Sequence, residues 1–155
     1  MGAWRNGKTE GRRTREEGRW EKGERGKMDG KSKIIRTVKD LEVYQLSFDS
    51  AMEIFEISKK FPKEERYSLT DQIRRSSRSI CASISEAWRK RKYQNYFVHK
   101  LAEAGQEAAE TQTWLEFALA CCYIENRTYG ALNEKYEHIF AMLTAMERKA
   151  DSFCK

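Results

Sequence analysis

The sequence predicts an all-α protein, an antiparallel up-down-up-down four-helix bundle, on three observations. From residue 40 onward, apolar residues recur at steps of three and four, which is the helical period. The chain has one proline, and seven of its nine glycines lie in residues 1–30, so the remainder allows long uninterrupted helices. No segment shows sustained alternation of period two, so no sheet is expected.

Residues 1–36 are predicted to be a disordered basic tail rich in glycine and arginine, and residues 37–155 the bundle domain. Residues 1–33 carry 11 Lys or Arg against 6 Asp or Glu, whereas residues 34–155 carry 19 against 18. The tail has too few aliphatic residues to offset the entropy of ordering. It fits an inert solvated segment, translation upstream of a start at Met28, or an arm that stacks on single-stranded RNA.

The first helix is expected to run from Asp40, a suitable N-cap, to near Phe61, because Pro62 disfavours helical geometry in the residue before it. Its predicted core face is Leu41, Tyr44, Phe48, Ala51 or Met52, and Phe55.

The second helix is expected to begin after Ser68 as N-cap, with Asp71 three residues on, and to extend to about Lys92. Its predicted core side is Leu69, Ile73, Ile80, Ile84 and Ala87, with Ser76, Ser77 and Ser83 on or beside that side. Small residues on a core face let a neighbouring helix approach closely. A helical serine can satisfy its hydroxyl on the carbonyl one turn back.

The third and fourth helices carry heptad seams with alternating steps of three and four. The third seam is Phe97, Leu101, Ala104, Ala108, Thr111, Leu115, Ala118 and Cys122. The fourth is Tyr129, Leu132, Tyr136, Ile139, Leu143, Met146, Ala150 and Phe153. Short links near residues 62–67, 89–94 and 124–128 favour antiparallel neighbours.

Motifs of common enzyme classes are missing from the sequence, so no enzymatic activity, cofactor or metal site is expected. Neither histidine, His99 or His138, completes the Glu-x-x-His pair of a di-iron bundle. There is no glycine-rich phosphate loop and no catalytic serine or zinc motif. Cys122, on the third seam, is expected to be a buried, inert thiol.

No membrane partner is expected, because the longest apolar run, residues 117–124, is shorter than the ~20 residues that cross a bilayer. The tail lacks the apolar segment of a signal peptide. We therefore expect a cytoplasmic protein with reduced thiols.

Cations concentrate on the second helix and at its end. With Ile73 at zero on a helical wheel, four arginines fall between about 100° and 200°, away from the core. They are Arg74, Arg75, Arg78 and Arg89. Lys90, Arg91 and Lys92 extend the cluster, Lys100 follows on the third helix, and Tyr93, Tyr96 and Phe97 interleave with them. This surface fits a nucleic-acid interface, a solvated or salt-bridged face, or a protein interface.

An acidic strip on the third helix, Glu103, Glu107 and Glu110, follows the spacing i, i+4, i+7. It could meet the basic stripe of a neighbouring copy and so close a ring. A solvated face explains the strip equally well.

Several motifs in order resemble the four-helix-bundle family of 23S rRNA intervening-sequence proteins. They are DLEVYQ (40–45), KFPKEE (60–65), LTDQIRR (69–75), SICASISE (79–86) and AETQTWLE (109–116). The likeness covers roughly residues 38–153. It departs from the family at residues 81–87, where Cys81, Ala82, Ser83, Ser85 and Ala87 replace the usual residues, and in the basic turn at residues 88–92.

The resemblance implies the bundle fold and assembly as a ring-like homopentamer. It extends to the accessory variability proteins of diversity-generating retroelements, which share the ring and bind nucleic acid and a reverse transcriptase. We therefore expect a non-enzymatic homo-oligomer that binds RNA or DNA through its basic surface. The alternative is a protein-interaction scaffold or adaptor, possibly for a reverse transcriptase.

Overall fold

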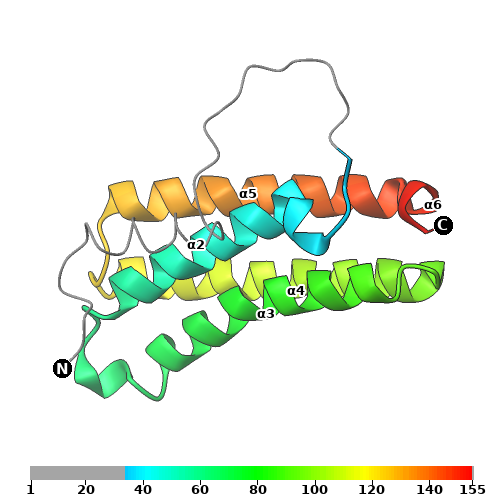
Figure 1. Ribbon diagram of the computed structural model, residues 1–155. Coiled ribbons are helices and arrows are strands. Elements are labelled where there is room, and N and C mark those ends of the chain that lie inside the picture. Colours follow the sequence, from blue (N-terminus) through cyan, green and yellow to red (C-terminus); the bar gives the residue numbers. More distant parts are fainter. Residues whose placement is uncertain (1–33, 155) are drawn as a thin grey trace, which may run out of the picture. The chain divides into compact units, whose positions relative to one another are not determined.

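Four long helices make up most of residues 34–154, the part of the chain that the computed structural model describes (Figure 1). They are α2 (Glu42–Ser58), α3 (Leu69–Arg89), α4 (Gln94–Ala120) and α5 (Asn126–Arg148). Two 3-10 turns, η2 (Val38–Asp40) and η3 (Lys63–Glu65), precede α2 and α3, and a single turn, α6 (Ala150–Phe153), follows α5. Residues 34–154 contain no strand. The all-α bundle prediction is therefore confirmed, whereas the predicted disorder of residues 1–36 falls almost entirely outside the described residues.

The two helix starts differ from the sequence expectation in which side chain accepts the free backbone N–H groups. Asp40 caps the η2 turn, because its carboxylate accepts from the backbone N–H of Thr37 at 2.8 Å, and Leu41 occupies the N-cap position of α2. Ser68 is at the N-cap position of α3, as predicted, but its side chain does not cap. The Glu65 carboxylate accepts from the Leu69 N–H at 3.2 Å instead.

Contacts distant in sequence join the connection after α2 to the end of α4. The Tyr123 hydroxyl donates to Glu65 Oε1 at 3.1 Å, and the rings of Phe61 and Tyr123 lie 5.6 Å apart. Glu65 therefore links the start of α3 at Leu69 to Tyr123, which follows the end of α4.

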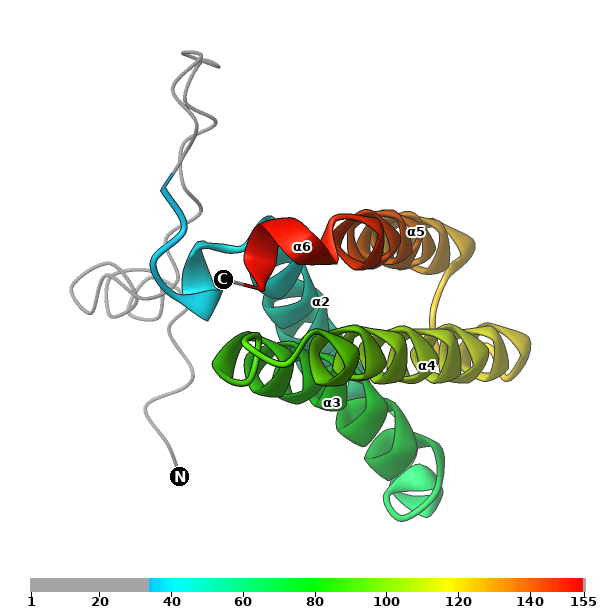
Figure 2. The same cartoon turned by 90° about the vertical axis from the view of Figure 1, so that its right-hand side faces the viewer.

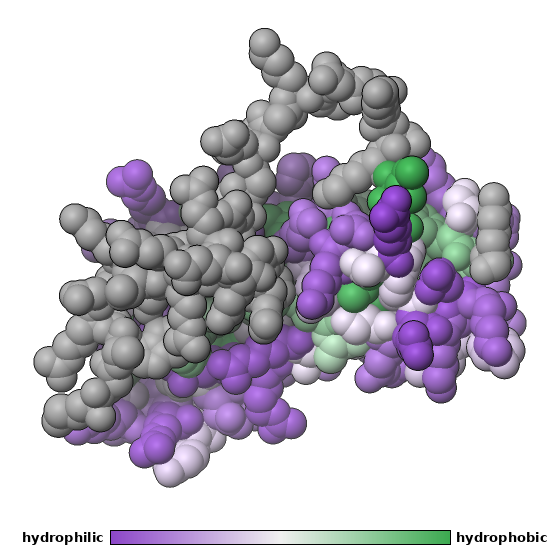
Figure 3. All heavy atoms as spheres, viewed as in Figure 1, coloured by the Kyte–Doolittle hydropathy of each residue, from purple (hydrophilic) through white to green (hydrophobic). Residues whose placement is uncertain are grey.

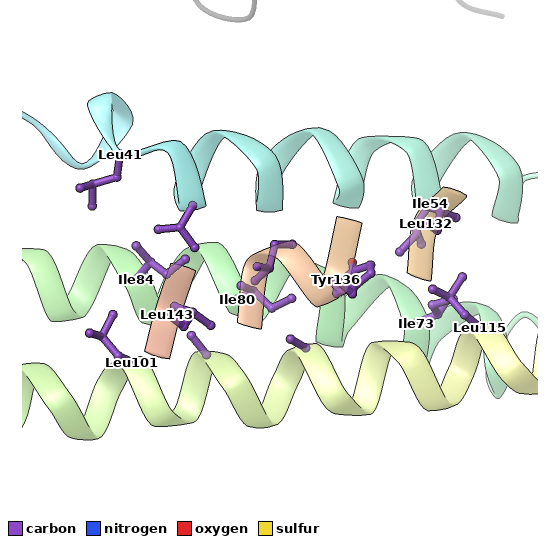
Figure 4. Packing of buried hydrophobic residues seen from close by; sticks show 14 of the residues in the cluster. Leu41, Ile54, Ile73, Ile80, Ile84, Leu101, Leu115, Leu132, Tyr136 and Leu143 are labelled. Atoms are coloured by element: carbon purple, nitrogen blue, oxygen red, sulfur yellow. The ribbon is translucent and has the colours of Figure 1, made fainter. Parts of the chain in front are cut away.

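The helices share one hydrophobic core, and α4 lies between α3 and α5 in the view of Figure 2. The predicted seam of α4 is buried from Phe97 to Ala118. The predicted fourth seam is buried at Leu132, Tyr136, Ile139, Leu143 and Met146 of α5 and at Ala150 of α6. Figure 4 shows how residues of all four helices, such as Ile54, Ile80, Leu101 and Tyr136, meet between the ribbons.

The predicted core face of α2 is confirmed at Leu41 and Ala51 and is wrong by about one residue in phase at its other positions. Tyr44, Phe48 and Phe55 are only half-buried, and Met52 is exposed. Besides Ala51, the buried residues of α2 are Val43, Ser47, Ser50, Ile54 and Ser58. The three serines fit there because each hydroxyl donates to a carbonyl of the preceding turn, Ser47 to Val43 at 2.7 Å for example.

The α3 and α4 helices form the most extensive helix pair within the described residues. Small side chains line their contact, as predicted: Ser76, Ala104 and Ala108 are all at most 2% exposed. The Thr111 hydroxyl lies 2.8 Å from the Ser76 hydroxyl and also 2.8 Å from the Glu107 carbonyl, so polar groups in this contact are paired within it.

Cys122 does not lie in the core, so its prediction as a buried thiol on the α4 seam is wrong. It is exposed and has a φ of 61°, a left-handed conformation. The N–H of Tyr123 donates to the Ala118 carbonyl at 2.8 Å, and the N–H of Cys122 donates to the Leu119 carbonyl at 2.9 Å. This pattern is a Schellman cap, in which glycine usually fills the left-handed position. The seam therefore ends at Ala118, because α4 ends at Ala120 and the left-handed Cys122 is part of its cap.

Within residues 34–154, no helix is both long and apolar enough to cross a lipid bilayer.

Candidate nucleic-acid interface

Three cations surround the half-buried ring of Phe55, where α2 faces α3. Lys59 Nζ lies 4.6 Å from the ring centroid, and the guanidinium carbons of Arg74 and Arg78 lie 4.9 and 5.5 Å from it. We call Phe55, Lys59, Arg74 and Arg78 the Phe55 cluster. Phe55 and Lys59 follow one another at i, i+4 on α2, and Arg74 and Arg78 do so on α3, so each pair shares one helix face.

Arg74 is held in a fixed position in this cluster. Its Nε donates to the Ser58 hydroxyl at 2.7 Å, and Ser58 is itself buried. Partial burial lowers the pKa of Arg74, the Arg78 charge lowers it further, and Glu56 acts in the opposite direction. Because an arginine remains charged at any physiological pH, the two guanidinium groups repel one another, and a bound anion would relieve that repulsion.

A second basic cluster occupies the connection from α3 to α4, where every cation after Arg89 lies over an aromatic ring. Lys90 lies 4.7 Å from the Tyr96 ring, Arg91 lies 4.2 Å from the Trp88 ring, and Lys92 lies 4.7 Å from the Tyr93 ring. We call residues 88–96 the connection cluster. Arg91 is also fixed to the backbone, since its Nη1 donates to the Trp88 carbonyl at 2.7 Å.

The structure divides the predicted arginine stripe: Arg74 and Arg78 belong to the Phe55 cluster and Arg89 to the connection cluster, whereas Arg75 belongs to neither. Arg78 and Arg89 are 11 residues apart on one helix, which is roughly 16 Å at the α-helical rise. Hydrophilic side chains cover the lower edge of the view in Figure 3, where Figure 1 places α3.

Two of the eight predicted cations have carboxylate partners. Arg75 lies 3.9 Å from Asp71, a long contact between exposed side chains that contributes little. Lys100 is held firmly, 2.6 Å from Glu103 and 2.7 Å from Glu86, with its side chain only 18% exposed. The hydrogen bonds that Lys100 donates to Glu103 and then to Glu86 raise the pKa of Lys100. Lys100 therefore links α3 to α4 and is poorly placed to take a phosphate.

The other six cations form no ion pair with any carboxylate of residues 34–154. They are Arg74, Arg78, Arg89, Lys90, Arg91 and Lys92. No ion pair within the described part of the chain therefore neutralises these six charges. Such pairing would have removed the physical basis of a surface that binds polyanions.

The aromatic residues near these cations differ in their availability. Phe97 is 0% exposed and its ring lies 5.8 Å from that of Phe153, so it belongs to the core. Tyr93, at the N-cap position of α4, is 57% exposed. Sequence reasoning missed Phe55 and Lys59, although their i, i+4 spacing on α2 was a visible signal.

The acidic strip of α4 is partly neutralised within the chain. Glu103 pairs with Lys100 and lies 3.1 Å from His99. Burial raises the pKa of Glu107, the neighbouring Glu110 adds to this, and Arg75 opposes it. The adjacent arginines of α3 therefore have different surroundings. The charge of Arg75 lowers the pKa of Glu107 in the acidic strip, whereas Arg74 and Arg78 lie over the Phe55 ring.

The described residues differ from a metal centre in how their potential ligands are placed, and Cys81 is a partly buried thiol. Within residues 34–154, no three or more His, Cys, Asp or Glu side chains come together as a metal site would require. Burial raises the pKa of the Cys81 thiol to about 12, so this thiol stays protonated and unreactive at neutral pH.

Comparisons with known proteins give one consistent result. The family model for the 23S rRNA-intervening sequence protein matches residues 39–145. Among solved structures, the chain is similar to a protein with unknown function from the S23 ribosomal protein family of Bacteroides thetaiotaomicron. The two share 31% sequence identity with a TM-score of 0.62, over 68% of this chain and 95% of that one. No curated protein matches the chain.

Proposed function

Because this chain belongs to the 23S rRNA-intervening sequence protein family, we propose that it is a non-enzymatic protein that binds RNA or DNA through its basic surface. The observation that carries this proposal is the Arg74–Arg78 pair, two guanidinium groups over one ring with no carboxylate partner in residues 34–154. The connection cluster supplies a second group of cations, Arg89 to Lys92. We also propose that the protein is cytoplasmic, which is in line with its free cysteine thiols.

Binding of this kind acts mainly on phosphates and tolerates different sequences. Arginine matches phosphate with a planar fork of donors, and each neutralised phosphate releases counterions. The affinity is therefore expected to fall steeply with salt, by a log–log slope of about 0.7 to 0.9 per phosphate contact.

The test is fluorescence anisotropy of a labelled, structured 23S rRNA fragment over a salt series. The double variant Arg74→Gln/Arg78→Gln should lose about tenfold to a hundredfold in affinity near 0.1 M salt, and its salt slope should fall by about 1.4 to 1.8. The matched control is Arg127→Gln/Arg148→Gln, which removes the same charge from exposed positions of α5. It should stay near wild type.

Equal losses in the two double variants would show that net charge, and not the Phe55 cluster, governs binding. If the wild-type chain binds no nucleic acid even at low salt, the nucleic-acid function is wrong. A protein-interaction scaffold, with a reverse transcriptase among its candidate partners, would then be favoured.

We further propose that consecutive helices run antiparallel, in an up-down-up-down bundle. The order of contacts supports this: Lys100 early in α4 meets Glu86 late in α3, whereas Thr111 farther along α4 meets the earlier Ser76. The contacts of α4 with the following helices obey the same rule: Gln94 at its start meets Asp151 of α6, and Gln112 farther along meets Asn133 early in α5.

We also propose that copies of the chain assemble as a ring, as a homopentamer. The family resemblance supports this, and so does an aromatic pair on α4, the half-buried Trp114 and the exposed Phe117. Their rings lie 5.9 Å apart, and Phe117 is 53% exposed. Light scattering during size exclusion is expected to give about five times the mass of one chain. A monomeric mass at micromolar concentration would exclude the ring.

A further inference from the structure

We propose that the α3–α4 connection binds an unpaired base, stacked on the ring of Tyr93, so that the protein prefers single-stranded to double-stranded nucleic acid. This inference rests on the proposed nucleic-acid function and adds the class of strand. Three features of the connection cluster carry it: the exposure of Tyr93, its fixed backbone, and the cations beside it.

Tyr93 is a large aromatic side chain that the fold leaves in solvent. It is 57% exposed, whereas its neighbours Trp88 and Tyr96 are partly covered by the bundle. As the N-cap residue of α4 it has an extended backbone, with φ −106° and ψ 93°, and it stands outside the helical turns. Burial in the core of the described chain therefore does not account for an aromatic residue here.

The backbone of Tyr93 is fixed by hydrogen bonds on both sides. Its N–H donates to the Lys90 carbonyl at 3.0 Å, and its carbonyl accepts from the Phe97 N–H at 2.9 Å. Phe97 is anchored in the core, so the position of Tyr93 is tied to the bundle. A ring carried on a fixed backbone loses little conformational entropy when a base stacks on it.

The cations around Tyr93 match a strand that carries one phosphate per base. Lys92 Nζ lies 4.7 Å from the Tyr93 ring, and Arg89, Lys90 and Arg91 precede it in the chain. Single-strand binding sites combine these two features, a cationic track for the backbone and an aromatic ring for the bases. In a duplex the bases are stacked on each other, so a base would have to leave the helix to reach the ring.

The experiment compares two labelled probes of similar length, a single-stranded oligouridylate and a double-stranded RNA, with the full chain. Tyr93→Leu removes the ring and keeps an apolar side chain, and Tyr93→Phe keeps the ring. We expect Tyr93→Leu to lose about tenfold in affinity for the single strand and less than about twofold for the duplex, with Tyr93→Phe close to wild type. As a second readout, photo-cross-linking of an oligonucleotide that carries 5-iodouridine should label Tyr93.

The outcomes separate this inference from the proposed function. Equal losses on the two probes, or no loss with Tyr93→Leu and no cross-link at Tyr93, would overturn the stacking site even if Arg74→Gln/Arg78→Gln weakens binding. Arg78 of the Phe55 cluster and Arg89, where α3 ends, are roughly 16 Å apart along α3, and Tyr93 follows Arg89 in the connection, so the two sets of substitutions are expected to act independently. If neither probe binds the wild-type chain, the proposed function fails together with this inference.

Discussion

Replacing Ala108 by leucine is expected to destabilise the bundle by about 2–3 kcal/mol. Ala108 is 0% exposed on the face of α4 that packs most extensively in the described fold, against α3. Ser76 and Thr111 are hydrogen bonded to each other in this contact, at 2.8 Å, so the two helices are held close together. Three added carbon atoms would therefore have to push α3 and α4 apart or force side chains out of their rotamers.

The measurement is the free energy of unfolding from urea denaturation, and the control is the adjacent position. Ala109 is exposed on the same helix, so Ala109→Leu adds the same volume with the same change in helix propensity. It should change the stability by no more than about 0.5 kcal/mol. Should Ala108→Leu be as stable as Ala109→Leu, the α3–α4 contact is looser than the small side chains indicate.

The helical seams of α4 and α5 could be predicted because their core residues are mostly apolar and follow a strict step pattern. Leu101, Leu115, Leu132 and Leu143 mark the seams, and the alanines between them keep the same period. The one departure on α4 was its end. The step pattern continues to Cys122, but it cannot reveal that the backbone turns left-handed there.

The core face of α2 could not be predicted from apolar residues, because serines occupy it. Ser47, Ser50 and Ser58 are at most 2% exposed. A serine counts as polar in a periodicity argument, but its hydroxyl is satisfied on its own helix and its small volume suits a close contact. Phe55, by contrast, looked like a core residue and lies at the basic cluster.

The cations of the candidate site could be predicted from the sequence, but the residues that contact them could not. Residue types alone identified the cations of α3 and of the connection. Their partners come from other helices, so sequence spacing could not reveal them: Arg74 meets Ser58 and Phe55 of α2, and Lys100 meets Glu86 of α3. Only the three-dimensional packing distinguishes a neutralised lysine from an unpaired arginine.

Replacing Tyr136 by phenylalanine is expected to stabilise the protein by about 1–2 kcal/mol. Tyr136 is 0% exposed, and its hydroxyl has no hydrogen-bond partner among residues 34–154. The Thr111 hydroxyl is close enough to lower the pKa of Tyr136 against the effect of burial, but the two side chains do not meet the geometry of a hydrogen bond, and Thr111 bonds to Ser76 and to the Glu107 carbonyl instead. Figure 4 shows Tyr136 between the ribbons, with Ile80 drawn on one side of it and Ile54 and Ile73 on the other, all members of one buried apolar cluster.

The hydroxyl of Tyr136 is therefore a buried polar group that loses its hydration on folding without replacement. Burial raises the pKa of Tyr136, so the group stays neutral, and its desolvation penalty does not change with pH in the neutral range. Phenylalanine keeps the ring and its packing and removes only the oxygen atom. The gain should therefore appear in full in the free energy of unfolding, at pH 6 as at pH 8.

Urea denaturation of Tyr136→Phe beside Tyr129→Phe, a half-buried position on the same helix, measures this gain. Tyr129→Phe should stay within about 0.5 kcal/mol of wild type. A loss of stability in Tyr136→Phe would show that the hydroxyl has a partner in solution, either a buried water molecule or Thr111 after a small shift. In that case the polar groups of Ser76, Thr111 and Tyr136 form one connected network at the centre of the bundle, and each is needed to satisfy the next.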